Sequence, residues 1–469
     1  MRQRVAIFTT ASLPWMTGTA VNPLFRAAYL AGDGHGDREV TLVIPWLSRS
    51  EQVLVYPNGV TFSSPSEQES FVRRWIEERV NFRPEFQIKF YPAKFSKELR
   101  SIIQVGDLTE CIPDEEADVA ILEEPEHLNW YHHGRKWKHK FRRVIGIVHT
   151  NYLEYVRREK NGRIIAFVLR YMNSWVTRIY CHKIIRLSAA TQDLPRSIVC
   201  NVHGVNPKFL EIGRAKCGQL QRGEAAFTKG AYYIGKMIWN KGYRELLHLL
   251  SKYEDQLDGL QVDLYGSGED SDAIRQTAEK LRLLVKVHPG RDHADKLFHD
   301  YKVFINPSTT DVVCTTTAEA LAMGKIVICA NHPSNEFFKQ FPNCRIYNDE
   351  SEFVKLTLGT LSDEPAPMTD DLLRKLSWEA ATERLIKAAK LNKEYPYKDT
   401  KPASLRSPKL KRRVEEASVY VHQCLSGVEV ARQAFGATPK SLYPDEQQCK
   451  ELGLAVPTRT HSRLSLKWD

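Results

Sequence analysis

The sequence predicts an α/β protein with two doubly wound parallel sheets that face each other across a cleft. Short apolar runs typical of buried strands alternate with helical stretches in two separate series. Residues 213–230, which have low apolar density and several glycines, separate the two series and predict a domain boundary. The 469 residues suffice for two domains and an extension, and 42% hydrophobic residues supports packed cores.

The first series predicts a domain over residues 1–212, and the second predicts a domain over residues 231–375. Strands are expected in the first at Val5–Thr10, Val40–Pro45, Gln87–Tyr91, Ala117–Leu122, Ile145–His149 and Ile184–Leu187. Strands are expected in the second at 231–234, 260–265, 285–288, 301–305 and 326–330.

The C-terminal part of the chain predicts helices and a linker. Residues 376–394 contain a strong helix from Ser377 to Ala389. Residues 395–469 begin with proline-containing and basic sequence, which indicates a linker. A short helical module from Val414 to Phe435 is expected to follow.

Two carboxylates in the second series predict a ligand site. Asp311 follows the strand 301–305, in a loop that also carries Ser308 and Thr310, and Glu319 lies on a helix expected from Thr315 to Met323. Ligands of open parallel sheets bind at the carboxyl ends of the strands. The carboxylates can accept hydrogen bonds from a sugar or a ribose, and the helix N-terminus favours an anion such as diphosphate.

Two lysines follow another strand of the second series. Lys236 and Lys241 lie between the strand 231–234 and a helix expected to start near Gly242. Fixed cations stabilise the negative charge that develops on a diphosphate leaving group. The alternative is a pair of solvated lysines that flank a turn.

Glycine-containing loops follow two further strands. Gly18 lies in the loop after the first strand, and Gly266 and Gly268 follow the strand 260–265. Glycine allows the backbone to approach a ligand closely, and ordinary tight turns are the alternative.

These motifs together resemble the donor site of retaining, nucleotide-sugar-dependent glycosyltransferases with the GT-B fold. Asp311 stands where that family usually has Glu, and Val312-Val313 replaces a common aromatic-glycine pair. The resemblance implies that Lys236 and Lys241 hold the diphosphate. It also implies that Asp311 binds the donor sugar and Glu319 the ribose.

The same resemblance assigns roles outside the acid and lysine pairs. It implies that His149 lies near the donor sugar as a hydroxyl partner, and that His203 is interdomain scaffolding. Gly18 would face the diphosphate from the first domain, and the remaining donor-binding residues would be Gly266, Gly268, Ser308 and Thr310. It implies no metal or other cofactor, and the helix 376–394 would cross back to the first domain.

Three further segments resemble the plant digalactosyldiacylglycerol synthases: Gly146–Tyr155, Asn201–Asn206 and Trp239–Gly242. The chain length suits the shorter form of that family. The resemblance, which covers about residues 1–395, implies transfer of galactose from UDP-galactose to monogalactosyldiacylglycerol. The product would carry a retained α(1→6) linkage, with front-face attack.

Other activities stay open at this point. A related retaining transferase could use a different UDP-sugar, such as UDP-glucose, or a soluble acceptor. A different class of protein, a non-catalytic membrane- or nucleic-acid-binding protein with an inactive GT-B scaffold, would bind UDP without transfer.

Composition constrains the partners and the compartment. A net charge of +10 favours an anionic partner, and no recognised nucleic-acid module is found. The nine cysteines form no C-x-x-C pair or zinc spacing, so reduced thiols are expected, and Cys314 is assigned no role.

Membrane contact is expected at two segments of the first domain. Residues 130–143 mix aromatic and basic residues, and Ile164–Tyr180 is apolar on one face. An ordinary basic surface and a core helix are the alternative. No apolar run reaches the length of a membrane span, and no cleavable transit peptide is expected. The resemblance implies peripheral attachment to the cytosolic face of the chloroplast outer envelope.

Overall fold

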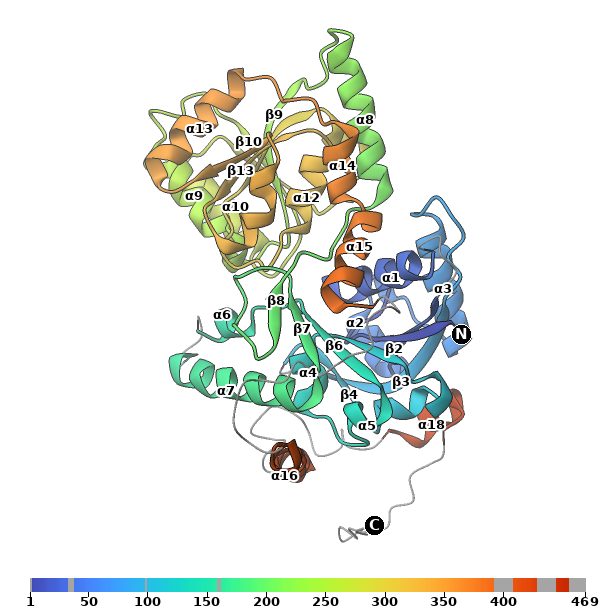
Figure 1. Ribbon diagram of the computed structural model, residues 1–469. Coiled ribbons are helices and arrows are strands. Elements are labelled where there is room, and N and C mark those ends of the chain that lie inside the picture. Colours follow the sequence, from blue (N-terminus) through green and yellow to red (C-terminus); the bar gives the residue numbers. More distant parts are fainter. Residues whose placement is uncertain are drawn as a thin grey trace.

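The computed structural model describes residues 2–32, 38–97, 99–157, 162–391, 408–427 and 444–454. Figure 1 shows two lobes, each built around one sheet with helices on both faces, and the chain passes between them after β8. The connection after residue 200 and the helix α15 (Trp378–Ala389) join the lobes.

Within the described residues, the first sheet has eight strands in the order β4-β3-β2-β1-β5-β6-β7-β8, parallel except for the β3–β4 pair. The strands are β1 (Gln3–Phe8), β2 (Arg38–Trp46), β3 (Gln87–Ser96), β4 (Ser101–Gln104), β5 (Val119–Glu123), β6 (Arg143–Val148), β7 (Lys183–Arg186) and β8 (Ser197–Val199). The helices of this lobe are α1 (Gly18–Ala31), α2 (Arg49–Val55), α3 (Pro65–Glu77), α4 (Pro125–Trp130), α5 (Trp137–Lys140), α6 (Tyr152–Arg157) and α7 (Gly162–Tyr180).

The second sheet has six described strands, all parallel, in the order β11-β10-β9-β12-β13-β14. They are β9 (Lys229–Ile234), β10 (Val262–Tyr265), β11 (Val285–His288), β12 (Tyr301–Asn306), β13 (Ile326–Ala330) and β14 (Cys344–Tyr347). The helices around it are α8 (Pro207–Gln221), α9 (Tyr243–Lys252), α10 (Ser271–Lys280), α11 (Lys296–His299), α12 (Thr315–Ala322), α13 (Glu350–Ser362) and α14 (Asp370–Leu376).

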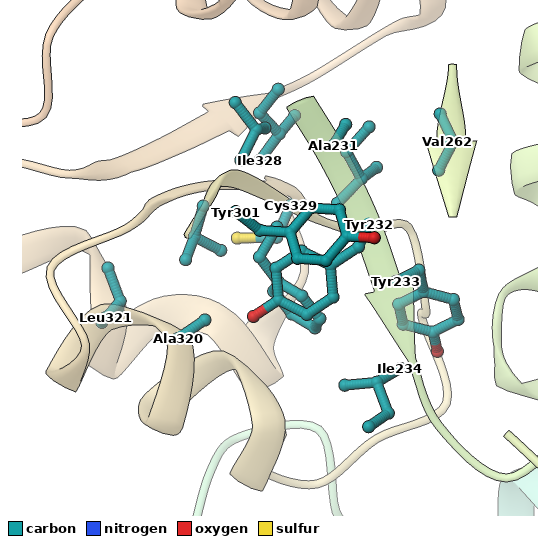
Figure 2. Close-up of a cluster of buried hydrophobic side chains, with 14 of the residues drawn as sticks. Ala231, Tyr232, Tyr233, Ile234, Val262, Tyr301, Ala320, Leu321, Ile328 and Cys329 are labelled. Atoms are coloured by element: carbon teal, nitrogen blue, oxygen red, sulfur yellow. The ribbon is translucent and has the colours of Figure 1, made fainter. Parts of the chain in front are cut away.

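The core of the second lobe forms where β9 and β12 meet the helix α12. Figure 2 shows the rings of Tyr232 and Tyr301 at the centre of a buried cluster to which Ala320 and Leu321 of α12 also belong. The two tyrosine rings lie 4.7 Å apart between centroids, and Tyr232 is fully buried. Because strands of a parallel sheet are covered on both faces, their continuous apolar runs are visible in the sequence.

The predicted strands are present. Their ends shift by at most two residues, except that β3 continues five residues beyond the predicted end at Tyr91, and the structure adds β4, β8 and β14. These additional strands have three or four residues each, too short for a periodic signal. The predicted boundary at 213–230 falls partly within α8, which packs on the second core through Phe209, Leu210 and Ile212. Asn206 caps this helix by accepting a hydrogen bond from the backbone N–H of Lys208 at 3.0 Å.

The helix α15 lies against α1 of the first lobe. The ring of Trp378 stacks on that of Phe25 with 5.5 Å between centroids. At Gly204 a Cβ atom would lie only 2.5 Å from the backbone nitrogen of Trp378, so a glycine is required where the interlobe connection touches α15. The connection and α15 therefore form one close contact at the junction of the lobes.

The C-terminal part of the chain packs on the first lobe through α16 (Pro408–Gly427) and α18 (Glu446–Leu452). The indole N–H of Trp175 donates to Ser418 Oγ at 2.8 Å, and Gln448 donates to the carbonyls of Trp46 and Ala93. The helix predicted from Val414 to Phe435 is present to residue 427. Residues 428–435 and the predicted linker between 395 and 407 lie outside the described residues.

The aromatic residues of the segment 130–143 do not form the membrane-facing surface that was expected. Tyr131 is 4% exposed, Trp137 is fully buried, and Phe141 is 1% exposed. The rings of Trp137 and Phe141 pack against Phe8 of the central strand β1. The prediction for these aromatic residues was wrong because the sequence pattern could not distinguish core aromatics from surface ones. Among the described helices, none has the length and apolarity needed to cross a membrane.

Candidate active site

A cavity of about 240 Å³ lies between the two lobes, at the carboxyl ends of the central strands of each sheet. It brings together five of the predicted site residues: Gly18, His149, Lys241, Thr310 and Asp311. Other residues of its wall are Thr17, Thr19, Asn22, Glu124, Thr150, Asn151, Leu187, His203, Val312, Val313 and Thr315. The position agrees with the general rule that open parallel sheets bind ligands beyond the carboxyl ends of their strands.

The wall from the second lobe is built by a close approach of two loops. Gly242 has a φ of +88°, and a Cβ atom there would lie 2.8 Å from the backbone nitrogen of Ser308. Thr310 Oγ1 donates to the carbonyl of Asn240 at 2.7 Å. Only a glycine permits this backbone contact, and the contact places Lys241 beside Asp311.

Lys241 and Asp311 form an ion pair in the cavity wall. The distance from Lys241 Nζ to Asp311 Oδ1 is 2.5 Å, and the Asp311 side chain is 13% exposed. The sequence-based hypothesis gave the two side chains separate ligand groups, and the structure adds that each is held by the other. A partly buried, charge-assisted hydrogen bond fixes the direction of the ammonium group toward the cavity wall.

Cys314 lies close to this pair and carries no charge at neutral pH. Burial, followed by the negative charge of Asp311, raises the pKa of its thiol to about 11. A thiol that holds its proton is a poor nucleophile, in agreement with the absence of a role in the sequence-based prediction.

The wall from the first lobe centres on His149, which follows β6. Its Nε2 atom contacts Glu123 Oε2, and Glu123 Oε1 accepts a hydrogen bond from Arg26 Nε at 2.6 Å. Burial opposes ionisation of Glu123, but the charge of Arg26 and the hydrogen bonds from Arg26 and His149 outweigh it, so the pKa of this carboxyl lies below its ordinary value. Because the carboxylate accepts the Nε2 proton, Nδ1 of a neutral His149 is an acceptor.

His203 lies next to His149 with 5.0 Å between the ring centroids, and it also lines the cavity. Burial, reinforced by the nearby His149 and Arg26, lowers the pKa of His203 well below its ordinary value. The prediction that His203 is interdomain scaffolding therefore accounts for only part of its position, since a neutral imidazole lies in the cavity wall.

Glu124 is a cavity residue that the sequence reasoning missed. Its backbone has a φ of +66°, an uncommon value for a residue other than glycine. Its carboxylate accepts a hydrogen bond from Thr10 Oγ1 at 2.8 Å and another from Thr150 Oγ1. Strained backbone held by side-chain bonds is typical of functional positions. The signal was the acidic pair at the end of the buried strand β5, where Glu123 is the last strand residue and Glu124 follows it, since such strand ends face the ligand.

Glu319 lies outside the cavity wall and takes part in a different chain of hydrogen bonds. His293 Nδ1 lies 2.7 Å from Glu319 Oε2, and His293 Nε2 lies 2.7 Å from the hydroxyl of the buried Tyr232. The Glu319 side chain is 16% exposed. The carboxylate is thus oriented by a buried histidine that the sequence gave no reason to single out.

Gly266, Gly268 and Ser308, three other predicted site residues, also lie outside this cavity. A Cβ atom at Gly266 would lie 2.1 Å from the carbonyl of Gly235, and one at Gly268 would lie 2.3 Å from the carbonyl of Met237. These glycines thus permit close contact between two loops, and their predicted approach to a ligand stays a prediction. Ser308 is fully buried, with its hydroxyl 3.3 Å from that of Thr310.

Lys236 is exposed and does not line the cavity. The structure therefore does not bring the two predicted lysines together in the cavity wall. It lies near Glu269, whose pKa is lowered mainly by Arg100 and to a smaller extent by Lys236. Arg100 belongs to the first lobe, so its ion pair with Glu269 links the two lobes. Lys236 therefore belongs to an exposed cluster of charges that spans both lobes.

The two facing parallel sheets, with cationic, carboxylate and imidazole side chains at the cleft, define a GT-B glycosyltransferase. A family profile described as "Glycosyl transferases group 1" matches residues 228–363. The crystal structure of Anabaena HepE in complex with UDP superposes with a TM-score of 0.51 at 10% identity, covering 83% of this chain and 100% of that one. This likeness concerns the fold.

The chain belongs to the digalactosyldiacylglycerol synthase family. It is 65% identical to the chloroplastic digalactosyldiacylglycerol synthase 2 of Lotus japonicus over 97% of this chain and 98% of that protein. It is 66% identical to the Glycine max protein of the same name, with the same shares of each chain covered. The match extends over both lobes.

Proposed function

We propose that this protein is a galactolipid galactosyltransferase that transfers galactose from UDP-galactose to monogalactosyldiacylglycerol. The product is the α(1→6)-linked digalactosyldiacylglycerol, formed with retention at the anomeric carbon. The observation that carries the proposal is the placement of the Lys241–Asp311 pair and His149 on opposite walls of one interlobe cavity. Membership of a family whose relatives bear that enzyme's name supports the choice of donor and acceptor.

The proposed reaction is a front-face displacement. The 6-hydroxyl of the acceptor galactose attacks the anomeric carbon on the face from which UDP departs. The bond from that carbon to the diphosphate oxygen breaks, the new glycosidic bond forms, and the hydroxyl proton passes to the departing diphosphate. Lys241 stabilises the negative charge that develops on the diphosphate, because a fixed cation needs little reorganisation during the reaction.

The other residues bind and orient the substrates in this proposal. Asp311 accepts a hydrogen bond from a donor sugar hydroxyl while it holds Lys241. Glu319 accepts from the ribose through the oxygen that His293 does not occupy, so the nucleoside extends beyond the cavity along the second lobe. His149 accepts from a sugar hydroxyl through Nδ1, and Gly18 at the N-terminus of α1 faces the diphosphate.

Lys236 completes the proposed set as a second cation that meets the diphosphate from outside the cavity. Ser308 and Thr310 support the loop that carries Asp311, and Gly266 and Gly268 support the loop that carries Lys236. No metal or other cofactor is proposed, since lysines supply the positive charge. Activity that survives EDTA supports this part of the proposal, and strong inhibition by EDTA contradicts it.

We propose the cytosolic face of the chloroplast outer envelope as the location, with peripheral attachment. The relatives named above are described as chloroplastic, and a lipid acceptor requires access to a membrane surface.

The decisive experiment is product analysis with the purified full-length chain, UDP-galactose and monogalactosyldiacylglycerol in detergent micelles. We expect a digalactolipid whose new linkage NMR assigns as α(1→6). UDP-glucose and a soluble galactoside, offered in parallel, test the related transferase activities. Equal or better turnover with either one overturns the proposed donor or acceptor, and UDP binding without any transfer indicates an inactive scaffold.

A further inference from the structure

The outer face of α7 exposes a stripe of large apolar side chains. Ile164, Phe167 and Tyr171 are 73%, 60% and 63% exposed, and Ile165 and Val168 are about half exposed. Positions 164, 167, 168 and 171 follow the i, i+3, i+4, i+7 spacing, so these side chains share one side of the helix. A contiguous exposed apolar stripe of this kind marks an interaction surface.

The neighbouring helix α16 extends the apolar surface. Val414, Tyr420, Val421 and Leu425 are all about half exposed. Among the described residues, nine of the seventeen large apolar side chains that are exposed lie on α7 or α16. Figure 1 shows these two helices at the same side of the first lobe, with α16 on the side of α7 that faces away from the second lobe. The exposed apolar area is therefore concentrated at one place.

A groove of about 830 Å³ runs between the two helices. Its wall combines the guanidinium groups of Arg170, Arg178 and Arg196 with the apolar surfaces of Trp175 and Val414. Within the described part of the chain, none of these three arginines forms an ion pair with a carboxylate. Arg196 donates instead to the carbonyls of Cys181 and Arg178, which leaves its charge uncompensated.

One carboxylate that lines the groove, that of Glu415, is already engaged by Lys138. Burial, followed by the positive charge of Arg196, lowers the pKa of Lys138 despite this ion pair. The groove thus carries an excess of positive charge, with an exposed apolar stripe directly beside it. A ligand that satisfies both features has an anionic group next to hydrocarbon.

We infer that the α7–α16 groove binds the phosphate headgroups of anionic phospholipids while the outer face of α7 enters the bilayer interface. The inference rests on the proposed function, because a lipid acceptor requires the enzyme to work at a bilayer. A nucleic acid would meet the arginines but leave Ile164 and Phe167 in water. A bilayer supplies phosphate and hydrocarbon at adjacent depths.

The inference gives the C-terminal part of the chain a function. The helix α16 forms one wall of the groove and is fixed to α7 through the bond from Trp175 to Ser418 and that between Tyr180 and His422. These contacts orient α7 with its apolar stripe outward. Membrane attachment therefore depends on residues that lie beyond both sheets.

The test is flotation of the full-length protein with phosphatidylcholine vesicles, prepared with and without phosphatidylglycerol. We expect binding only to the anionic vesicles, and weaker binding at high salt. The double variant Arg170→Glu/Arg178→Glu should lower the partition coefficient by at least about thirtyfold, since each basic residue near an anionic surface contributes about a factor of five. Arg142→Glu/Arg275→Glu, which changes two exposed arginines elsewhere, is the matched control and should bind normally.

A second variant, Phe167→Ser, probes the apolar stripe, with the equally exposed Leu284→Ser as its control. Unchanged flotation of the double arginine variant, or equal binding of the wild type to neutral vesicles, overturns the inference. The inference is also overturned if the wild type dimerises through α7 and the Phe167→Ser variant is a monomer that still floats with the vesicles. Galactosyl transfer in detergent micelles, measured on the same preparations, should be normal in all variants, and its absence from the wild type refutes the proposed function separately.

Discussion

Lys241 Nζ and Asp311 Oδ1 lie 2.5 Å apart, although the two residues are 70 positions apart in the chain. The pair joins the loop after β9 to the loop after β12, which are neighbouring strands of the second sheet. Its formation depends on the glycine contact between Gly242 and Ser308. The same contact brings a cation and a carboxylate into the interlobe cavity.

Replacement of Lys241 by Ala should lower kcat for galactosyl transfer by about a hundredfold, or about 3 kcal/mol of barrier, because the charge on the departing diphosphate loses a fixed cation. Steady-state kinetics with UDP-galactose and galactolipid micelles measure this. The exposed Lys280→Ala is the control and should keep normal turnover. Near-normal turnover of Lys241→Ala would exclude the assigned role.

Lys236→Ala should act mainly on KM for UDP-galactose, because Lys236 lies outside the cavity.

Replacement of Gly242 by Ala should destabilise the protein by about 2–3 kcal/mol and lower activity, because the methyl group meets the Ser308 backbone and the residue keeps a positive φ. Urea unfolding measures the free energy difference. Gly223→Ala is a matched control, with a φ of +70° and nothing within 4 Å of the added carbon. We expect it to cost only about 1–2 kcal/mol and leave turnover intact. Equal effects of the two changes would contradict the importance of the loop contact.

His293 should act as a positioning residue for Glu319. We expect His293→Phe to raise KM for UDP-galactose by about tenfold with a smaller change in kcat, since ribose binding contributes to ground state and transition state alike. A cycle with Glu319→Gln should give a double variant no worse than the single ones, because both changes remove the same contact. His299→Phe serves as the control. Additive losses in the double variant would show that His293 does not act through Glu319.

Stability should fall as the solution is acidified from pH 7 to pH 5.5. Burial lowers the pKa values of His127, His132, His203 and His422 in the folded protein, that of His422 to about 4. The unfolded chain takes up these protons below about pH 6.5 and the folded chain does not, so acid favours unfolding.

Glu126 acts in the opposite direction in the same pH window. Burial raises its pKa to about 8, so at pH 7 the folded protein holds a proton that the unfolded chain releases. The net loss of stability over this window should be about 3 kcal/mol, measured by urea unfolding at each pH. Glu126→Gln removes the opposing contribution and should steepen the loss to about 5 kcal/mol. A flat profile for the wild type would refute the neutral state of the buried histidines.

The strands could be predicted because parallel sheets bury them on both faces, which leaves apolar runs such as Val5–Phe8. The acid pair could be located because both residues follow the end of β12. Glu123 and Arg26 could not be linked in advance, since a buried ion pair leaves no periodic signal and its partners are 97 residues apart. The aromatic residues at 130–143 were misplaced for a related reason, because composition does not reveal which side of a segment is buried.

The sequence by itself determined the order of strands and helices, the two-lobe organisation and the residue types available for nucleotide-sugar chemistry, because these depend on local periodicity and spacing. Only the tertiary structure decided which of those residues meet. It placed Lys241 against Asp311 and across from His149, left Lys236 exposed, and tied Glu319 to His293. Such contacts are set by the packing of loops that are far apart in the sequence, and the energies of those contacts are not encoded in any single segment.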